Sequence, residues 1–217
     1  MDRDFWLSRW EAGEIGFHQA EINPYLQQFW QRLDVPLGAP VFVPLCGKSL
    51  DMAWLLSQGH PVLGVELSTR AVEQFFREHD LQPMRTPAEV GVRYQANDVV
   101  IIAGDFFSLS PGEVEGIGAV YDRASLIALP RRMREHYAER LTSLVPTGVP
   151  MLLVALEYPQ DQMSGPPFSV SEEEVRQLYE GEFQVERLLA EDVLDAHPRF
   201  RQRGLRALTE KVYALWR

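Results

Sequence analysis

Residues 41–66 read VFVPLCGKSLDMAWLLSQGHPVLGVE, and this order is typical of one βαβ unit. An apolar run ends abruptly at Cys46-Gly47, a helical pattern follows, and a second apolar run ends in the acidic residue Glu66. In doubly wound folds, an acid at the end of the second strand, about 20 residues after the first turn, binds ribose hydroxyls. Glu66 lies 19 residues after Gly47, so the segment predicts a site for an adenosine-containing cofactor.

Similar apolar runs and helical patterns alternate along the rest of the chain. Besides the two runs above, strands are expected at residues 99–103, 119–121, 149–156, 183–190 and 209–216. Helices are expected near residues 24–33, 50–58, 69–79, 131–144 and 172–180, the second with Leu50, Ala53, Trp54 and Ser57 on one face. The first, third and last of these helices are expected to be capped by Asn23, Ser68 and Ser171. Residues 83–90 are expected to form a loop. Near-continuous apolar strands between helices indicate an α/β, doubly wound, mostly parallel sheet, and the last two strands indicate an antiparallel edge.

Composition excludes several classes of protein. A length of 217 residues fits one domain, and we expect an N-terminal arm over residues 1–35 and an α/β core over residues 41–217. The arm is too aromatic for a solvated tail, and it should pack over the site. One cysteine excludes an internal disulfide and suits the cytoplasm, and the cysteine and histidine pattern predicts no metal site.

Charge and hydropathy restrict the partners. A formal net charge of −10 argues against a nucleic-acid partner, which requires a basic face. No apolar run approaches the roughly 18 residues of a membrane span, and the acidic, aromatic N-terminus is not typical of a signal peptide. We therefore expect a small-molecule substrate and a monomer, without a nucleic-acid or membrane partner.

The turn after the first strand restricts the cofactor. Ligands of such folds bind beyond the carboxyl ends of the strands, where several chemically useful residues gather. The turn has one glycine, Gly47, rather than the three that allow a backbone to approach a pyrophosphate, which disfavours a nicotinamide dehydrogenase. A phosphate-binding loop is also excluded, since Phe42 stands where its first glycine is required. An adenosine ligand without phosphates indicates S-adenosylmethionine.

The chain resembles the thiopurine S-methyltransferases, in particular their bacterial members. The resemblance covers nearly the whole chain in order. It is carried by the segments GFHQ (16–19), PLCGKSLDM (44–52), GVELS (64–68), YDRASLIALP (121–130), GPPF (165–168) and EKVYAL (210–215).

This resemblance implies a class I methyltransferase with a Rossmann-like, seven-stranded sheet. It implies transfer of a methyl group from S-adenosylmethionine to the sulfur of aromatic or heterocyclic thiols such as thiopurines, with S-adenosylhomocysteine as the product. Methylation of selenium or tellurium compounds, or of another small nucleophile, stays open as an alternative. A cofactor-binding module without catalysis is a further alternative, but the aromatic arm argues against it.

The residues expected to bind the cofactor follow from position and from the resemblance. Glu66 would accept hydrogen bonds from the ribose, and the turn would offer backbone groups to the amino-acid end of the cofactor. An arm tryptophan would face the sulfonium by a cation–π contact, with Trp10 preferred and Trp6 open. The expected set is Trp10, Leu45, Gly47, Glu66, Asp105, Phe106 and Arg123.

The residues expected to bind the substrate come mainly from the resemblance. Arg123 would hold an anionic substrate or the cofactor carboxylate, and a salt bridge to Asp122 is the structural alternative. His18 lies among aromatic residues and is more typical of a structural histidine than of a general base, so no catalytic residue is assigned. Cys46 is interpreted as packing, and Lys48 as solvated or paired to a carboxylate. The expected set is Phe17, His18, Arg123, Pro167, Phe168 and Arg199.

Overall fold

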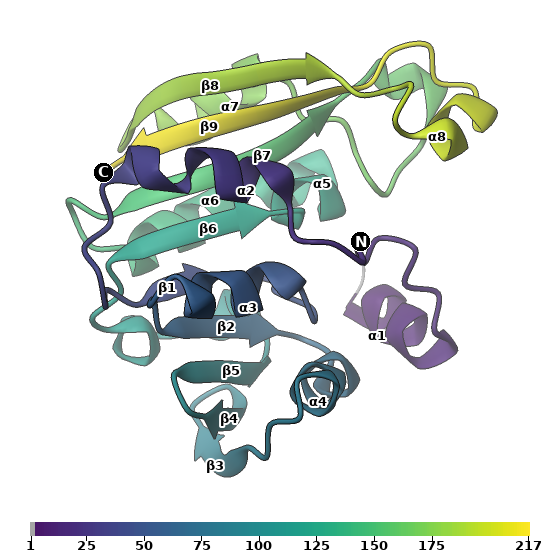
Figure 1. The fold of residues 1–217 in the computed structure, drawn as a ribbon. Coiled ribbons are helices and arrows are strands. Elements are labelled where there is room, and N and C mark those ends of the chain that lie inside the picture. The colour runs from purple at the N-terminus through teal and green to yellow at the C-terminus, as the bar shows by residue number, and fades with distance from the viewer. Residues whose placement is uncertain (1–2) are drawn as a thin grey trace. The chain divides into compact units, whose positions relative to one another are not determined.

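The computed structural model describes residues 3–217 (Figure 1). Residues 1–2 of the expected arm lie outside the described part of the chain. The chain divides into two compact units, Met1–Tyr121 and Asp122–Arg217. The parallel strands belong to the first unit, except that the last two residues of strand β6 fall in the second. The expected single domain stays a prediction.

The first unit contains a sheet in the order β3-β4-β5-β2-β1-β6. Its core is parallel, because β1 pairs with β2 and β6, and β2 pairs with β5. β1 and β2 are buried along their whole length, as their apolar runs predict. The strands of this core are β1 (Val41–Val43), β2 (Val62–Glu66), β5 (Val99–Gly104) and β6 (Ala119–Arg123).

Helices α2, α3 and α4 of the first unit begin where the sequence predicts, whereas helix α1 was not expected. The side chain of Asn23 accepts hydrogen bonds from the first backbone N–H groups of α2, and Ser49 and Ser68 do the same for α3 and α4. Helix α1 contacts α4, which packs on β2 and β5 (Figure 1). The helices are α1 (Arg3–Ala12), α2 (Pro24–Phe29), the 3₁₀ helix η1 (Trp30–Leu33), α3 (Leu50–Ser57) and α4 (Thr69–Glu78).

Two expectations about this unit were wrong. Residues 83–90 are not a loop, because β3 (Met84–Ala88) forms an antiparallel hairpin with β4 (Gly91–Ala96), which pairs in turn with β5. Both strands of the hairpin are largely exposed, and Pro87 stands in the outer one, so neither strand has an apolar run. Residues 3–217 therefore contain nine strands in place of the expected seven.

The predicted face of α3 was also wrong. Leu50, Ala53, Trp54 and Ser57 are partly buried or exposed, whereas the buried residues of this helix are Asp51, Met52 and Leu55. The pattern of apolar residues did not indicate the buried face of α3, because one of its three buried residues, Asp51, carries a carboxylate.

The second unit has strands in the order β7-β9-β8, and β9 pairs antiparallel with both β7 and β8, which confirms the predicted pairing of the last two strands. Ser171 caps α7 through the backbone N–H of Glu174, as predicted. The strands are β7 (Pro150–Glu157), β8 (Gln184–Asp192) and β9 (Thr209–Trp216). The helices are α5 (Ser125–Ala128), α6 (Arg131–Leu144), α7 (Glu172–Tyr179) and α8 (Pro198–Gln202).

Residues 3–217 also contain four short 3₁₀ helices, which are η1 above, η2 (Phe106–Ser108), η3 (Pro111–Val114) and η4 (Gln160–Gln162). Within residues 3–217, no helix has the length and apolar character needed to cross a bilayer.

Gly64 in β2 makes room for the turn that follows β1. A Cβ atom at this position would lie 2.7 Å from Cys46 Sγ and 3.4 Å from Ile101 Cγ1. We expect Gly64→Ala to lower the free energy of unfolding by about 1–3 kcal/mol through overpacking, as measured by urea denaturation. The double variant Gly64→Ala/Cys46→Ala should recover most of this loss. Equal losses in the single and double variants would contradict the steric explanation.

Candidate functional site

The turn after β1 has an unusual backbone. Leu45 and Gly47 have φ angles of 47° and 54°, in the left-handed region that costs a non-glycine residue energy. Cys46 between them is buried and donates its backbone N–H to Val65 O at 3.0 Å. Burial raises the pKa of the Cys46 thiol well above its usual value, and the charge of Glu66 raises it further. The thiol is therefore a packing group, in agreement with its interpretation from the sequence.

Glu66 closes this turn from the end of β2. Its side-chain Oε2 accepts the backbone N–H of Gly47 at 2.9 Å, and Oε1 accepts that of Ser68 at 2.8 Å. Only 7% of Glu66 is exposed. Burial raises the pKa of the Glu66 carboxyl, against the lowering effect of these N–H donors. A buried carboxylate thus joins the ends of β1 and β2 and keeps unused lone pairs for further donors.

Trp10 of α1 lies directly on this turn. A Cβ atom built on Gly47 would be 3.3 Å from Cζ2 and 3.7 Å from Cη2 of Trp10. Trp10 is buried, and its ring meets that of Phe17 edge-on at 5.4 Å. The Trp6 ring also meets the Phe17 ring edge-on, with 5.4 Å between the ring centroids. The contact with Gly47 favours Trp10 over Trp6 as the arm tryptophan at the site.

Phe17 and His18 follow in the arm. Phe17 is 40% exposed, one of few large apolar side chains that reach solvent. His18 is partly buried, and its backbone N–H donates to Ile15 O at 2.8 Å.

Asp105 and Phe106 follow β5. The Asp105 side chain caps η2 by accepting the N–H of Phe107 at 3.0 Å. Phe106 is buried, and its ring meets Phe107 edge-on at 5.5 Å. Phe106 is therefore buried, while Asp105 is partly exposed at the end of the strand.

Lys48 ties the turn to α4. Its ammonium lies 2.6 Å from Glu78 Oε1, and the residue is only 9% exposed. Pairing with a carboxylate, one of the two readings of Lys48 from the sequence, is the correct one.

In the second unit, Asp122 and Arg123 form the end of β6. Asp122 is fully buried and accepts a hydrogen bond from Tyr137 Oη at 2.9 Å. Arg123 is partly buried, and the next residue, Ala124, has a φ of 70°. The strand therefore ends in a turn whose backbone is strained at Ala124.

The segment GPPF is held by bonds on both sides. The N–H of Phe168 donates to Ile127 O at 2.7 Å, and Tyr158 Oη donates to Pro167 O. A Cβ atom on Gly165 would lie 2.5 Å from Phe168 Cδ1, so the Phe168 ring folds over that glycine. Pro167 and Phe168 are thus fixed as one partly buried surface.

Arg199 lies on α8 and is exposed. Its guanidinium carbon is 5.0 Å from the centroid of the Phe200 ring. Phe200 in turn anchors α8 in a cluster of buried apolar residues that includes Tyr158.

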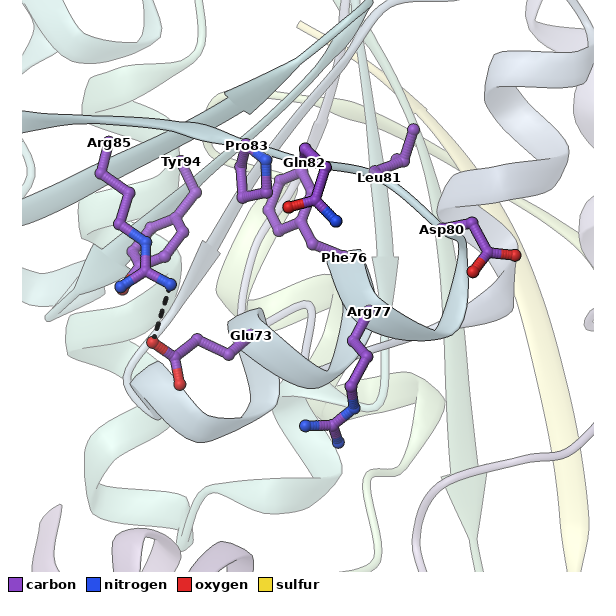
Figure 2. A pocket seen from close by; sticks show the side chains of 9 residues that line it. All are labelled: Glu73, Phe76, Arg77, Asp80, Leu81, Gln82, Pro83, Arg85 and Tyr94. Atoms are coloured by element: carbon purple, nitrogen blue, oxygen red, sulfur yellow. Dashed lines mark ion pairs between the residues drawn. The ribbon is translucent and has the colours of Figure 1, made fainter.

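A pocket of about 320 Å³ lies between α4 and the β3–β4 hairpin of the first unit (Figure 2). None of the predicted site residues lines it. Figure 2 shows Arg85 paired with Glu73, at 3.2 Å, and the Arg85 guanidinium lies 4.9 Å from the Tyr94 ring centroid. The charges of Arg85 and Glu73 in this pocket are therefore paired with each other. The lining residues are Glu73, Phe76, Arg77, Asp80, Leu81, Gln82, Pro83, Arg85 and Tyr94.

Comparison with known proteins identifies the family. A family model described as thiopurine S-methyltransferase matches residues 1–217. The chain belongs to the thiopurine S-methyltransferase family. A thiopurine S-methyltransferase of Methylococcus capsulatus is 49% identical over 216 residues, covering 99% of this chain and 97% of the relative. That of Xanthomonas axonopodis pv. citri is 49% identical over 217 residues and covers 100% of both chains.

Solved structures agree on the fold. A methyltransferase from Anabaena variabilis has a TM-score of 0.65 at 14% identity, covering 99% of this chain and 94% of the other. Magnesium protoporphyrin IX methyltransferase from Synechocystis, described with bound SAH, has a TM-score of 0.64 at 13% identity and covers 100% of both chains. The protein is an S-adenosylmethionine-dependent methyltransferase by family, and its fold is that of such enzymes.

The first unit fits the cofactor chemically. A buried carboxylate suits ribose hydroxyls, which are donors, and the Trp10 indole suits a sulfonium, which is a cation. Glycine suits position 47, because its φ is 54° and a Cβ atom there would crowd the Trp10 indole at 3.3 Å. Within residues 3–217, no cluster of three or more histidine, cysteine, aspartate or glutamate residues is placed to hold a metal ion.

One buried polar residue beside the turn after β1, Asp51, was not predicted from the sequence. Asp51 is fully buried, accepts the N–H of Asn23 at 2.8 Å and the hydroxyl of Tyr121 at 2.9 Å, and begins α3 next to the turn. Its only signal was an acid two residues after the capping Ser49. That pattern predicts a helix start and gives no sign of burial.

Asp122 predicts a pH dependence of stability. Burial raises its pKa from 3.8 to about 6, against the lowering effect of Ser125 and Tyr137. Because the native state holds this proton more tightly than the unfolded chain, the carboxyl contributes stability below about pH 4 that is lost as the pH rises through about 6. We expect Asp122→Asn to raise the free energy of unfolding by about 1–3 kcal/mol at about pH 8 and to change it little at about pH 4.

Urea denaturation across this pH range measures the difference. Asp161→Asn, at an exposed position, is the matched control and should leave the pH profile unchanged. Parallel profiles for the wild type and Asp122→Asn would contradict the prediction.

Proposed function

We propose that the protein transfers a methyl group from S-adenosylmethionine to the sulfur of aromatic or heterocyclic thiols such as thiopurines, by direct in-line displacement. The observation that carries this proposal is the Glu66 carboxylate. It is buried and bonded to Gly47 on a turn covered by Trp10, in a member of the thiopurine S-methyltransferase family. Bound S-adenosylmethionine supplies the methyl group on a positively charged sulfur.

The cofactor would be held mainly by the rim of the first unit. Glu66 would accept the ribose hydroxyls, the strained turn would present backbone groups, and Trp10 would attract the cationic sulfur by about 0.5–2 kcal/mol. The proposed cofactor residues are Trp10, Leu45, Gly47, Glu66, Asp105, Phe106 and Arg123.

The thiol would be held by the arm and by residues of the second unit. Pro167 and Phe168 offer a fixed apolar surface, which suits a flat aromatic ring. The arginines suit an anionic sulfur. The proposed substrate residues are Phe17, His18, Arg123, Pro167, Phe168 and Arg199.

No general base is needed in this proposal. An aromatic thiol is acidic enough to ionise near neutral pH, so the protein contributes orientation and the exclusion of water. In this proposal His18 contacts the substrate without transferring a proton, and arginine stabilises the thiolate. We further propose that the chain acts in the cytoplasm as a monomeric, single methyltransferase domain, with residues 1–35 covering the site.

Arg123→Ala tests how the thiolate is favoured. A nearby guanidinium lowers the pKa of a thiol, so its loss should reduce kcat/KM most at low pH, where the thiol is protonated. A reduction of about tenfold or more is expected below the thiol pKa, and less above it. Arg132→Ala, at an exposed position on α6, is the control. A pH–rate profile of unchanged shape in Arg123→Ala would contradict this role.

A panel of acceptors tests the reaction class. Formation of S-adenosylhomocysteine is measured with a heteroaryl thiol, its oxygen analogue, an amine, selenite and tellurite. The proposal expects the thiol to have the highest kcat/KM. A higher value for selenium or tellurium would establish the alternative acceptor class. Tight binding of S-adenosylhomocysteine without turnover of any acceptor would indicate a binding module.

A further inference from the structure

Besides the contact of α1 with α4, three contacts join the arm to the core of the first unit. Trp10 lies on Gly47, the Asn23 N–H donates to Asp51, and Trp30 Nε1 donates to His60 Nε2 at 3.1 Å. The first contact is apolar and is the one that the proposed function uses. The second is a buried hydrogen bond to the carboxylate of Asp51, which is not among the proposed cofactor residues.

Asp51 is placed to connect this site with the arm. It begins α3 directly after the turn and donates its backbone N–H to Ser49 Oγ at 3.2 Å. One carboxylate oxygen, Oδ1, faces the start of α2, and the other, Oδ2, accepts Tyr121 Oη from β6. All of these groups belong to the first unit and are buried or partly buried.

The bond to Asn23 fixes the far end of the segment that carries α1. Residues 13–23 connect α1 to α2, and the Asn23 side chain caps α2 through Tyr25 and Leu26. Pinning Asn23 beside the turn shortens the free connection to Trp10. A shorter connection raises the effective concentration of Trp10 at Gly47 without any new contact.

We propose that Asp51 is a positioning residue, which holds the arm against the turn through the backbone of Asn23 and so keeps Trp10 over Gly47. The consequence for cofactor affinity rests on the proposed function, whereas the effect on the arm does not. Asp51 touches neither the cofactor nor the thiol in this assignment.

The test variant is Asp51→Leu/Tyr121→Phe. It replaces a hydrogen-bonded pair by apolar groups of similar shape, which is tolerated far better than leaving one partner unpaired. Its control is Tyr121→Phe, which keeps the bond to Asn23. A second control is Asp51→Asn, since its amide carbonyl can accept the Asn23 N–H while its NH₂ donates to Tyr121.

The first readout is trypsin cleavage after Arg9 in the ligand-free protein, followed by mass spectrometry. The test variant should lose residues 1–9 about tenfold faster than either control, the change expected for one buried hydrogen bond to a charged group. Equal cleavage rates in the test variant and Tyr121→Phe would overturn the proposal, whatever the wild type binds. Faster cleavage in Asp51→Asn, at the rate of the test variant, would also overturn it.

The second readout is kinetic. The KM for S-adenosylmethionine should rise about tenfold in the test variant, while kcat at saturation changes less than threefold, and both controls should behave as the wild type. A lower melting temperature with unchanged KM and unchanged cleavage would show a structural role only and would overturn the proposal. Failure of the wild type to bind S-adenosylhomocysteine by calorimetry would refute the proposed function, and the cleavage result would still decide the role of Asp51.

Discussion

Glu66→Gln is expected to weaken S-adenosylhomocysteine binding by about 1–3 kcal/mol, which is roughly 5- to 150-fold in Kd. The carboxylate already accepts the N–H groups of Gly47 and Ser68, and it would also accept the ribose hydroxyls. An amide has one acceptor oxygen, and its NH₂ group would face an N–H donor across one of these bonds. Isothermal titration calorimetry of the wild type and the variant measures the loss.

The pH dependence separates this role from general damage. Burial raises the pKa of Glu66, and only the ionised form can accept the turn and the ribose together. Affinity in the wild type should therefore fall as the pH drops through this raised pKa, and that fall should be absent in Glu66→Gln. Glu73→Gln, on the first turns of α4, is the control and should bind like the wild type. Equal affinities of the wild type and Glu66→Gln would refute the ribose assignment.

Arg134→Met is expected to cause the largest loss of stability in the second unit. Arg134 is 2% exposed, and its Nη1 lies 2.7 Å from both oxygens of Glu174. Its Nε donates to Leu126 O at 3.0 Å and Leu129 O at 2.9 Å. Removing the guanidinium leaves the Glu174 carboxylate without its cation and takes one donor from each of the two carbonyls, of which Leu126 O keeps the N–H of Leu129. Breaking such a buried pair costs about 3–5 kcal/mol. For a chain of this length the melting temperature should fall by roughly 6–20 °C in calorimetry.

Arg176→Met is the matched control for this prediction. Arg176 pairs with Glu172 and Glu180 on the surface of α7, and such exposed pairs contribute little to stability because water and salt screen them. The double variant Arg134→Met/Glu174→Met should recover much of the loss, because no buried charge remains. A melting temperature within about 2 °C of the wild type in Arg134→Met would contradict the assignment of a buried ion pair.

The same arginine connects stability with the proposed substrate surface. Its guanidinium carbon lies 6.0 Å from the Phe168 ring centroid, and Leu126 and Leu129 flank Ile127, which binds the Phe168 backbone. We infer that the buried pair keeps this surface in place.

Periodicity predicted the parallel core because buried strands and capped helices have strong local signals. The apolar run of β2 ends at Glu66, and the structure places that carboxylate at the turn after β1, as its spacing predicts. Asn23, Ser68 and Ser171 cap the helices that they were expected to cap.

The failures have physical causes. The β3–β4 hairpin is exposed and contains Pro87, so it lacks the apolar run by which strands are recognised. Asp51 was missed because a carboxylate in the first turn of a helix is usually solvated, whereas here two distant donors satisfy it. Contacts between residues far apart in the sequence leave no local pattern.

The position of the transferred methyl group tests the proposed reaction most directly. The purified protein is incubated with S-adenosylmethionine that carries a trideuterated methyl group and with a heteroaryl thiol, and tandem mass spectrometry locates the label. The proposed function predicts a labelled thioether and S-adenosylhomocysteine in equal amounts. Label on a ring nitrogen or oxygen, or no labelled product from a protein that binds S-adenosylhomocysteine, would contradict thiol methylation.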